Sequence, residues 1–470
     1  MPTLNLHNTR TRRTEAFTPR VAGSVGLYCC GPTVYHDAHI GNLRTYVFED
    51  LLVRALRLDG LQVTHVCNIT DVGHLVSDAD SGEDKMEQGA RREGRSVWEI
   101  AEHYTGLFRR DLDRLNIVPA TVWPKATDHI AEQIAMVQGL LDKGHAYPAA
   151  DGVYFDVGTF GRYAEFARKD LQGQEAGARV APSDGKRNHE DFALWKFSPA
   201  GQQRLMEWDS PWGRGFPGWH IECSAMSLRY LGPQFDIHCG GIDHIPVHHT
   251  NEIAQSEAFL GVHPWVNVWL HGEFLVLDKG KMSKSGGGFL TLQSLLDRGF
   301  SALDYRFFCL GTHYRAPLSF SFEALEGARA GRLSLKSRLT ALAGAVPCSR
   351  AEAVAHPLWA KFWEQVADDL NAPRALAVAW EVAKQADLAP ALKAGLIDRM
   401  DAWLGLDLLV PDADPAQLGQ EEALLLERRA EARAGRDWAR SDELRAELER
   451  RGILVKDGKD GQRWERVGPR

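Results

Sequence analysis

The chain has 470 residues, of which 44% are hydrophobic and 25% charged, and its formal net charge is −8. This length fits about three domains, and the composition is that of a soluble globular protein. We find no apolar run of about 18 residues and no secretory leader, so we expect neither a membrane span nor export. The acidic balance argues against a general nucleic-acid coat but allows a local basic face.

Seven cysteines are scattered along the sequence. An odd, scattered set in a long chain argues against a disulfide framework, so we expect a reducing, cytoplasmic location. Under those conditions some of the thiols can serve as metal ligands.

The first predicted elements form a strand–helix–strand unit. Residues 25–29 are a short apolar strand, which Gly31 and Pro32 interrupt. From Ile40 onward apolar residues recur at helical spacing, and residues 61–66 are a second strand. This order is typical of a parallel sheet.

The next stretch mixes charged loops and helices. Residues 78–95 are highly charged and contain several glycines, so we expect a solvated loop or the edge of a helix. Thr127 and Asp128 resemble the start of a helix that ends at Gly144. Residues 170–205 are predicted to be mainly loop. Predicted strands return at residues 235–237 and 265–270, which indicates a parallel sheet interrupted by an insertion.

The second half of the chain has a different composition. Beyond about residue 320 the composition shifts to Ala, Leu, Arg and Glu, which is typical of a helical bundle. Residues 411–415 are predicted to be a linker. A last helical pair and a possible hairpin over residues 452–467 end the chain.

One candidate site lies between the first strand and the first helix. The N-terminus of a helix favours anions because its N–H groups point outward along the helix dipole. His39 and Asn42 can donate to phosphate oxygens, and Gly41 permits close approach. The alternative is an ordinary loop, since His and Gly are common before helices.

A second candidate site is the run Lys281-Met-Ser-Lys284-Ser285, which three glycines follow. Two lysines three residues apart, with hydroxyl groups between and after them, suit a mobile loop that clamps a polyphosphate. The alternative is a solvated basic loop.

A third set of residues could bind a metal ion. His248 and Glu252 are four residues apart, which places both on one face of a helix. Together with Cys30 and Cys223 they would supply ligands that suit zinc. The alternatives are buried cysteines that act as small hydrophobic residues and a solvated His–Glu pair.

The first two motifs, in this order and far apart, resemble the two signatures of class I aminoacyl-tRNA synthetases. The resemblance implies a Rossmann-like domain that binds ATP between them. His39, Asn42, Lys281 and Lys284 would then be the catalytic residues, with Lys284 stabilising the pentavalent phosphorus. The sequence departs from the family where Asn42 replaces a second histidine and where three glycines replace the usual Leu-Gly-Asn.

Over essentially the whole chain the sequence is similar to cysteinyl-tRNA synthetases, including residues 68–71 (Asn-Ile-Thr-Asp) and 240–243 (Gly-Gly-Ile-Asp). The resemblance implies one Zn²⁺ per chain and ATP used with Mg²⁺. The residues implied for each ligand are, for zinc, Cys30, Cys223, His248 and Glu252; for L-cysteine, Gly31, Thr70, Trp219 and Asp243; and for ATP, His39, Gly41, Asn42, Gly241, Asp243 and Lys284.

Zinc binding would explain how cysteine is told apart from serine. A thiol, with a pKa of about 8.5, loses its proton to zinc far more readily than a hydroxyl does. A pocket that selected its substrate by size alone would discriminate poorly between cysteine and serine. The alternative is a closed zinc site that only joins the two halves of the sheet. Four protein ligands would ordinarily favour such a structural site.

The C-terminal helices carry a spaced row of arginines: Arg429, Arg433, Arg436 and Arg440. Such a row can follow an RNA backbone, but it can equally form ion pairs with interleaved acidic residues. Resemblance to the family's anticodon-binding tail favours RNA. It implies Arg436, Trp438 and Trp464 as tRNA contacts, with Trp464 a candidate for base stacking.

We weigh three functions. The first is a cysteine–tRNA ligase that uses ATP, L-cysteine and tRNA(Cys), forms AMP and pyrophosphate, and acts as a monomer. The second is a ligase that passes the same cysteinyl adenylate to a small amine, as in mycothiol biosynthesis. The third is a non-enzymatic zinc protein that binds RNA. The C-terminal tail favours the first over the second, and the two nucleotide signatures favour an enzyme over the third.

The expected fold class is α/β, with a Rossmann-like parallel-sheet catalytic domain that carries an insertion, then an α-helical bundle and a small C-terminal anticodon-binding domain. We expect the catalytic domain at 1–118 and 206–300, the insertion at 119–205, the stem-contact region and bundle at 301–410, and the anticodon-binding domain at 411–470.

Overall fold

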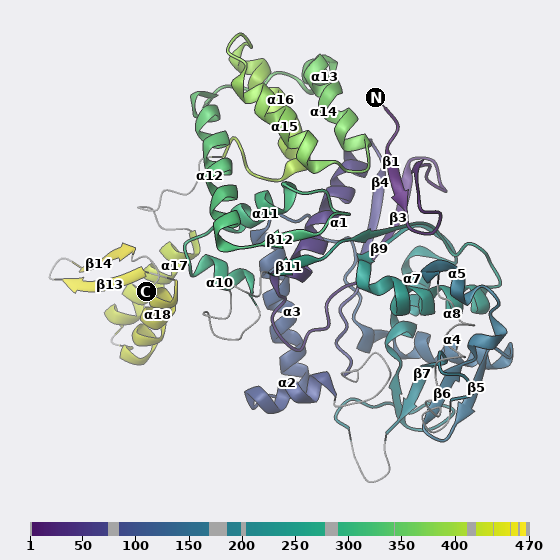
Figure 1. Ribbon diagram of the computed structural model, residues 1–470. Coiled ribbons are helices and arrows are strands. Elements are labelled where there is room, and N and C mark those ends of the chain that lie inside the picture. Colours follow the sequence, from purple (N-terminus) through teal and green to yellow (C-terminus); the bar gives the residue numbers. More distant parts are fainter. Residues whose placement is uncertain are drawn as a thin grey trace.

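The computed structural model describes residues 2–73, 84–168, 186–198, 204–277, 290–342, 344–410, 420–435, 437–451, 453–458 and 461–466. Figure 1 shows a central sheet with a helical bundle above it, an insertion at the lower right and a C-terminal unit at the left. No helix in the described part of the chain has the length and apolarity needed to cross a membrane. Each of the seven cysteines is a free thiol.

The central sheet has four parallel strands in the order β10-β9-β3-β4. Their bounds are β3 (Ser24–Cys29), β4 (Gln62–Cys67), β9 (Phe235–Gly241) and β10 (Val266–Gly272). Since β4 and β9 lie on opposite sides of β3, the strand order reverses there. Ligands of open α/β sheets bind at such a reversal, outside the carboxyl ends of the strands.

Helices and a hairpin surround this sheet. The first connection is α1 (Ile40–Leu58), which packs its buried face on the sheet and confirms the predicted strand–helix–strand unit. The hairpin of β1 (Asn5–Asn8) and β2 (Arg13–Ala16) lies beside β10, where the Thr9 N–H donates to the Trp269 carbonyl at 2.7 Å. The following helices are α2 (Lys85–Glu93), α3 (Val97–Arg114), α7 (Trp219–Leu231) and α8 (Thr250–Leu260).

Of the charged stretch at residues 78–95, residues 78–83 lie outside the described residues, and the rest is more regular than predicted. From Lys85 it is a helix, which Asp84 caps by accepting from the Met86 and Glu87 N–H groups, and Gly94 ends it with φ 64°. The side chain of Asp84 pairs with the buried Arg204, so tertiary contacts hold a segment whose composition alone indicated solvent.

The insertion has its own antiparallel sheet in the order β5-β6-β7-β8. The elements are a 3₁₀ turn (Ala126–His129), α4 (Ile130–Asp142), β5 (Ala146–Ala149), β6 (Gly152–Phe155), a second 3₁₀ turn (Val157–Thr159), α5 (Tyr163–Ala167), β7 (Phe192–Phe197) and β8 (Gly215–Pro217). The strand β7 falls where residues 170–205 were predicted to be mainly loop. Of this stretch only residues 186–198, 204 and 205 are described, and β7, whose first four residues are buried, is a strand that the sequence did not indicate.

The predicted helical bundle is confirmed. It comprises α10 (Leu292–Leu296), α11 (Ala302–Leu310), α12 (Phe322–Leu339), a 3₁₀ turn (Thr340–Leu342), α13 (Arg350–Ala355), α14 (Pro357–Ala367), α15 (Ala372–Lys384) and α16 (Pro390–Leu404). A short parallel pair, β11 (Leu275–Leu277) and β12 (Leu318–Phe320), joins it to the sheet. The bundle is tied to α1 by the Trp403 indole N–H, which donates to the Leu51 carbonyl at 2.9 Å.

The C-terminal unit consists of α17 (Gln420–Ala434), α18 (Trp438–Arg450) and the hairpin of β13 (Ile453–Gly458) with β14 (Gly461–Arg466), as predicted. Its small core contains Leu426, Leu448, Ile453 and Val455. The predicted linker at 411–415 lies outside the described residues.

Candidate active site and metal centre

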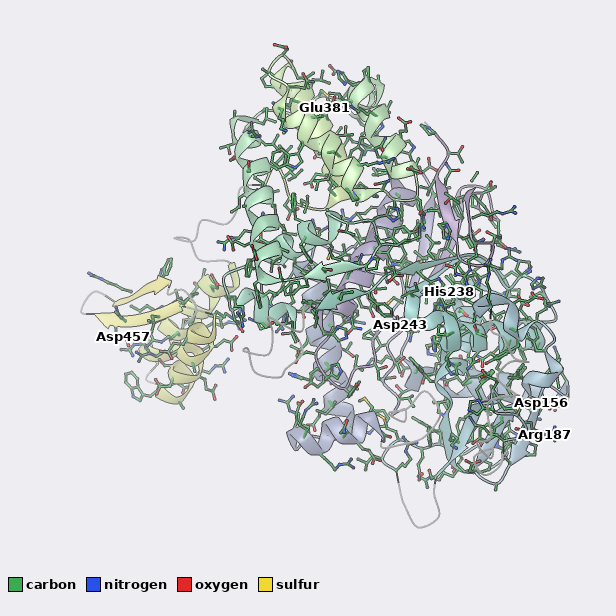
Figure 2. All side chains as sticks on the ribbon, viewed as in Figure 1. Asp156, Arg187, His238, Asp243, Glu381 and Asp457 are labelled. Atoms are coloured by element: carbon green, nitrogen blue, oxygen red, sulfur yellow. The ribbon has the colours of Figure 1, made fainter. Side chains whose placement is uncertain are left out.

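A cleft of about 280 Å³ opens at the carboxyl ends of β3 and β9, where the strand order reverses. Figure 2 labels Asp243 and His238 in this region. The lining includes many of the residues that the sequence predicted for ATP and cysteine, namely Gly31, His39, Asn42, Trp219, Gly241 and Asp243, and the predicted zinc ligand Cys30. Residues from both halves of the sheet therefore meet in one cleft.

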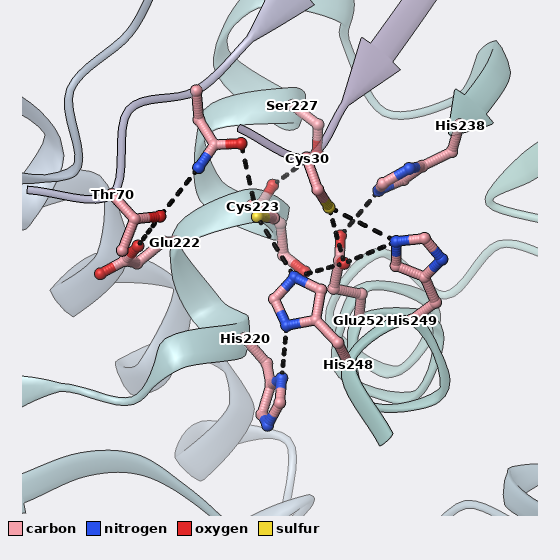
Figure 3. A network of polar contacts seen from close by, with 12 residues as sticks. Cys30, Thr70, His220, Glu222, Cys223, Ser227, His238, His248, His249 and Glu252 are labelled. Carbon is pink, nitrogen blue, oxygen red and sulfur yellow. Dashed lines mark hydrogen bonds and ion pairs between the residues drawn. The ribbon is translucent and has the colours of Figure 1, made fainter. Parts of the chain in front are cut away.

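The four predicted zinc ligands meet beside this cleft (Figure 3). One ligand atom from each of Cys30, Cys223, His248 and Glu252 lies within 4.8 Å of the others, and all four residues are buried. His248 Nε2 is 3.1 Å from Glu252 Oε1 and 3.5 Å from Cys223 Sγ. Cys30 Sγ is 3.9 Å from Glu252 Oε1.

Local structure explains how residues so far apart in sequence converge. Cys30 directly follows β3, and Cys223 lies in the second turn of α7. A single π-helical turn (Ile245–His249) leads into α8, and it places His248 one turn before Glu252. A 3₁₀ turn (Ile242–His244) joins this segment to the end of β9.

A second group of possible ligands overlaps the first. Cys30 and Glu252 also lie within 4.8 Å of ring nitrogens of His238 and His249. His238 Nε2 is 2.9 Å from Glu252 Oε2, and His249 Nε2 is 3.4 Å from Cys30 Sγ. The two groups share a thiol and a carboxylate, and they differ in whether a second thiol or a second imidazole completes the set.

The donor chemistry of this cluster fits a divalent cation. Burial raises the pKa of the Cys30 thiol well above its ordinary value, and the neighbouring Cys223 and Glu252 raise it further. Burial also raises the pKa of the Cys223 thiol, so both thiols would stay protonated by themselves, whereas a bound cation stabilises their anions. Further contacts orient the ligands, since His248 Nδ1 is 2.9 Å from His220 Nδ1, which leaves Nε2 facing the cluster.

Asn68 organises the wall between the metal cluster and the cleft. Its side-chain oxygen accepts from the Gly31 N–H at 2.9 Å, and its amide donates to the Thr70 hydroxyl at 3.0 Å. The Thr70 hydroxyl in turn donates to the buried Glu222 at 3.2 Å. A Cβ on Gly31 would lie 1.5 Å from the Asn68 carbonyl oxygen, so only glycine fits there.

The first signature forms the N-terminus of α1. His39 is the N-cap, and its Nδ1 accepts from the Asn42 N–H at 3.1 Å, while the Asn42 side chain accepts from the His39 N–H at 3.3 Å. Burial lowers the pKa of His39, so the ring is neutral near pH 7 and carries its proton on Nε2. A Cβ on Gly41 would lie 2.9 Å from His39 Nδ1.

The remaining predicted residues fall into three groups. The Trp219 ring lies 4.5 Å from the His248 ring, and Asp243 follows Gly241 at the end of β9. Thr70, by contrast, reaches the site through Asn68 and Glu222 and is not among the residues that line the cleft. Lys281, Lys284 and Arg436 lie outside the described residues.

The described arginines of the C-terminal row, Arg429, Arg433 and Arg440, are each paired with an acidic side chain. Arg429 is fully buried and donates to both carboxylate oxygens of Asp457, at 3.0 and 2.9 Å, and to Gln462 at 2.8 Å. For Arg429 the alternative of an ion pair therefore holds, because the side chain joins α17 to the hairpin (Figure 2 labels Asp457). Trp464 packs against the small core, whereas Trp438 is 55% exposed.

The sequence reading assigned no role to several residues of the site: Asn68, His220, Glu222, His238 and His249. Two signals were present. Asn68 directly follows the second predicted strand, where parallel strands present functional side chains, and the others lie next to or within a few residues of a predicted ligand or of Trp219. The spacing of these residues in the sequence does not show which of their side chains point into the site.

Comparison with known proteins agrees with the fold. Residues 16–330 match the model of the class I (C) tRNA synthetase catalytic domain. A solved methionyl-tRNA synthetase of Mycobacterium tuberculosis in complex with methionyl-adenylate shares the fold, with a TM-score of 0.53 at 16% identity over 83% of this chain and 92% of that one. The protein is thus a class I aminoacyl-tRNA synthetase.

Two further matches specify the amino acid. Residues 416–464 match the cysteinyl-tRNA ligase anticodon-binding domain. "Cysteine--tRNA ligase 1" of Burkholderia lata is 52% identical over 98% of this chain and 96% of its own length, and the enzyme of Treponema denticola is 45% identical over 99% and 100%. The chain belongs to the cysteine–tRNA ligase family. The anticodon-binding domain argues against a ligase that uses a small amine. Together with the catalytic domain, it also argues against a non-enzymatic RNA-binding protein.

Proposed function

We propose that this cysteine–tRNA ligase holds one zinc ion with Cys30, Cys223, His248 and Glu252. The observation that carries the proposal is the convergence of four buried donor atoms within 4.8 Å of one another, at the edge of the cleft. When bound there, zinc would supply a Lewis acid that prefers a thiolate to a hydroxyl. The substrate cysteine would then lie beside Gly31, Thr70, Trp219 and Asp243.

The residues of the cleft bind and orient the reactants. The carboxylate of cysteine attacks the α-phosphorus of ATP, pyrophosphate leaves, and a terminal ribose hydroxyl of tRNA then attacks the carbonyl carbon and releases AMP. No protein nucleophile takes part, so positioning and charge stabilisation account for the rate. The neutral His39, with its Nε2–H, and the N-terminus of α1 would donate to phosphate oxygens, together with Asn42 and Gly41.

The other contacts in this proposal come from the family resemblance. Lys281 and Lys284 would clamp the phosphates with Mg²⁺, and Gly241 with Asp243 would bind the ribose of ATP. Trp438, Arg436 and Trp464 would contact tRNA(Cys). Trp438 is 55% exposed, and its ring lies 5.6 Å from the Arg433 guanidinium. The free thiols support a cytoplasmic location, and we propose a monomer.

Four single variants, assayed for zinc content and for cysteine-dependent pyrophosphate exchange, test the ligand set. Cys223→Ala and His248→Ala should lose zinc and exchange, because each removes a ligand that only the proposed set contains. His238→Ala and His249→Gln should keep the zinc. Cys348→Ser, far from the cluster in sequence and only partly buried, is the control.

Either of two results would count against the proposal. Full exchange activity in zinc-free protein would exclude any role for the metal in selecting cysteine. Zinc loss in the His238 and His249 variants, with retention in the Cys223 and His248 variants, would assign the ion to the overlapping group instead.

A further inference from the structure

Arg204 of the insertion makes contacts that the proposals for zinc, cysteine and ATP do not use. It lies between β7 and β8, and its charged side chain is buried. Its Nη2 donates to the Gly73 carbonyl at 2.7 Å and to the Asp84 carboxylate. A buried guanidinium is stable only when it is paired and hydrogen-bonded, so these partners define its position closely.

The Arg204 side chain joins two segments that carry proposed contacts to cysteine. Gly73 lies three residues after Thr70, and Phe216 of β8 lies three residues before Trp219. The guanidinium carbon of Arg204 lies 3.4 Å from the centroid of the Phe216 ring, which is close enough for stacking. One planar group therefore contacts the first segment through a hydrogen bond and the second through its face.

The same two segments are joined a second time, closer to the metal cluster. There the Thr70 hydroxyl donates to Glu222 of α7 at 3.2 Å, and both residues are buried. The Arg204 contacts and this hydrogen bond are separate in sequence along both segments. Together they fix how far the loop after β4 lies from the start of α7.

The short connection from Phe216 to Trp219 has little room to adjust. The Gly218 N–H donates to the Leu194 carbonyl at 3.0 Å, and a Cβ on Gly218 would collide with the Ala193 carbonyl oxygen. This close packing on β7 means that a shift of Phe216 is passed on to Trp219.

Asp84 has a different part in this arrangement. Its carboxylate balances the charge of Arg204 and caps α2, and a Cβ on Gly73 would collide with it. The neighbouring Leu205 N–H donates to Glu87 of α2 at 3.0 Å. Asp84 thus supplies charge balance and joins the insertion to α2, whereas the contacts of Arg204 with Gly73 and Phe216 lead to the amino-acid side of the cleft.

We infer that Arg204 is a positioning residue for L-cysteine, which holds the segments of Thr70 and Trp219 at the separation that the amino acid needs. Arg204 is not among the described residues that line the cleft, so it acts through those segments. The inference rests on the proposed placement of cysteine beside Thr70 and Trp219. The residues proposed for ATP lie on α1 and after β9, so the effect should be confined to the amino acid.

The variant Arg204→Met keeps an unbranched side chain but removes the charge and the donors. In pyrophosphate exchange its KM for cysteine should rise about tenfold, because displaced positioning groups have effects of this order, while its KM for ATP stays within about twofold. A KM does not depend on the fraction of active protein, so partial unfolding does not imitate this result. Arg214→Met, at an exposed ion pair with Glu207 in the same insertion, is the matched control and should keep both values.

A double variant separates positioning from stability. Arg204→Met alone leaves the Asp84 carboxylate buried without its cation, which lowers the melting temperature. In Arg204→Met/Asp84→Asn that charge is gone and asparagine still caps α2, so the melting temperature should recover. The KM for cysteine should stay raised, because Gly73 still lacks its donor. Recovery of the KM together with the melting temperature, or an equal rise in the KM for ATP, would overturn the inference.

Failure of this inference differs from failure of the proposed function. An unchanged KM for cysteine in Trp219→Leu would overturn the proposed placement of the amino acid, on which the inference rests. A raised KM in Trp219→Leu with an unchanged KM in Arg204→Met would overturn the positioning role alone. Zinc content should stay at the wild-type value in the Arg204 variants, since none of the proposed ligands is changed.

Discussion

At the scale of single residues, the site depends on one backbone contact between two loops. Gly31 lies just after β3, and Asn68, 37 residues later, lies just after β4. The Gly31 N–H donates to the Asn68 side-chain oxygen, and the Asn68 carbonyl oxygen leaves no room for a Cβ on Gly31. The same Asn68 orients Thr70, which donates to Glu222. A shift of this loop would therefore move the amino-acid side of the cleft as a unit.

The substitution Gly31→Ala tests this contact. The added Cβ would meet the Asn68 carbonyl oxygen at 1.5 Å, so the loop that carries Cys30 must move. We expect pyrophosphate exchange to fall by about 100-fold, because displacement of about 1 Å in a positioning element has effects of that size. Gly106→Ala in α3, where a Cβ would meet nothing within 4 Å, is the matched control and should retain activity. Activity near wild type in Gly31→Ala would contradict the close approach.

At the scale of elements, β4 carries an ionisable group into the core. His65 is 6% exposed, neither ring nitrogen has a hydrogen-bond partner among the residues described, and burial lowers its pKa to about 4. The unfolded chain takes up a proton near pH 6.5, the folded chain only near pH 4. Between these values the unfolded state binds more protons, so stability falls as the pH falls.

Replacing His65 should flatten this dependence on pH. Between pH 6.5 and pH 4 the wild-type protein should lose about 3 kcal/mol of unfolding free energy through this group, and His65→Leu should lose correspondingly less. Chemical denaturation at pH 7 and at pH 5 measures the difference. His189→Gln, at an exposed position in the insertion, should behave as wild type. An identical pH slope in wild type and His65→Leu would show that His65 is not buried as described.

The elements also show where sequence patterns are informative. The strand–helix–strand unit of β3, α1 and β4 is predictable because each has a clear apolar period, and the helices beyond residue 320 are predictable from composition. The helix α2 and the strand β7 were missed for a common reason. Asp84 of α2 is paired with Arg204, and β7 is covered by its neighbours in the insertion, so distant contacts stabilise both.

At the scale of the whole molecule, segments that are far apart in the sequence come together to form the active site. The motif residues could be named from the sequence, because their local strings are distinctive. Their environment could not: Asn68, Glu222 and the imidazoles of His238 and His249 act through contacts that only the folded sheet creates. Arg429 shows the reverse case, in which a residue with the pattern of an RNA contact is a buried structural pair with Asp457.

The overlap of two possible ligand groups makes the identity of the metal ligands the central claim. X-ray absorption at the zinc edge of the zinc-loaded enzyme, without substrate, counts the sulfur atoms bound to the metal. The proposed set predicts two sulfurs, from Cys30 and Cys223. A single sulfur with two imidazoles would place the ion on His238 and His249 and would contradict the account.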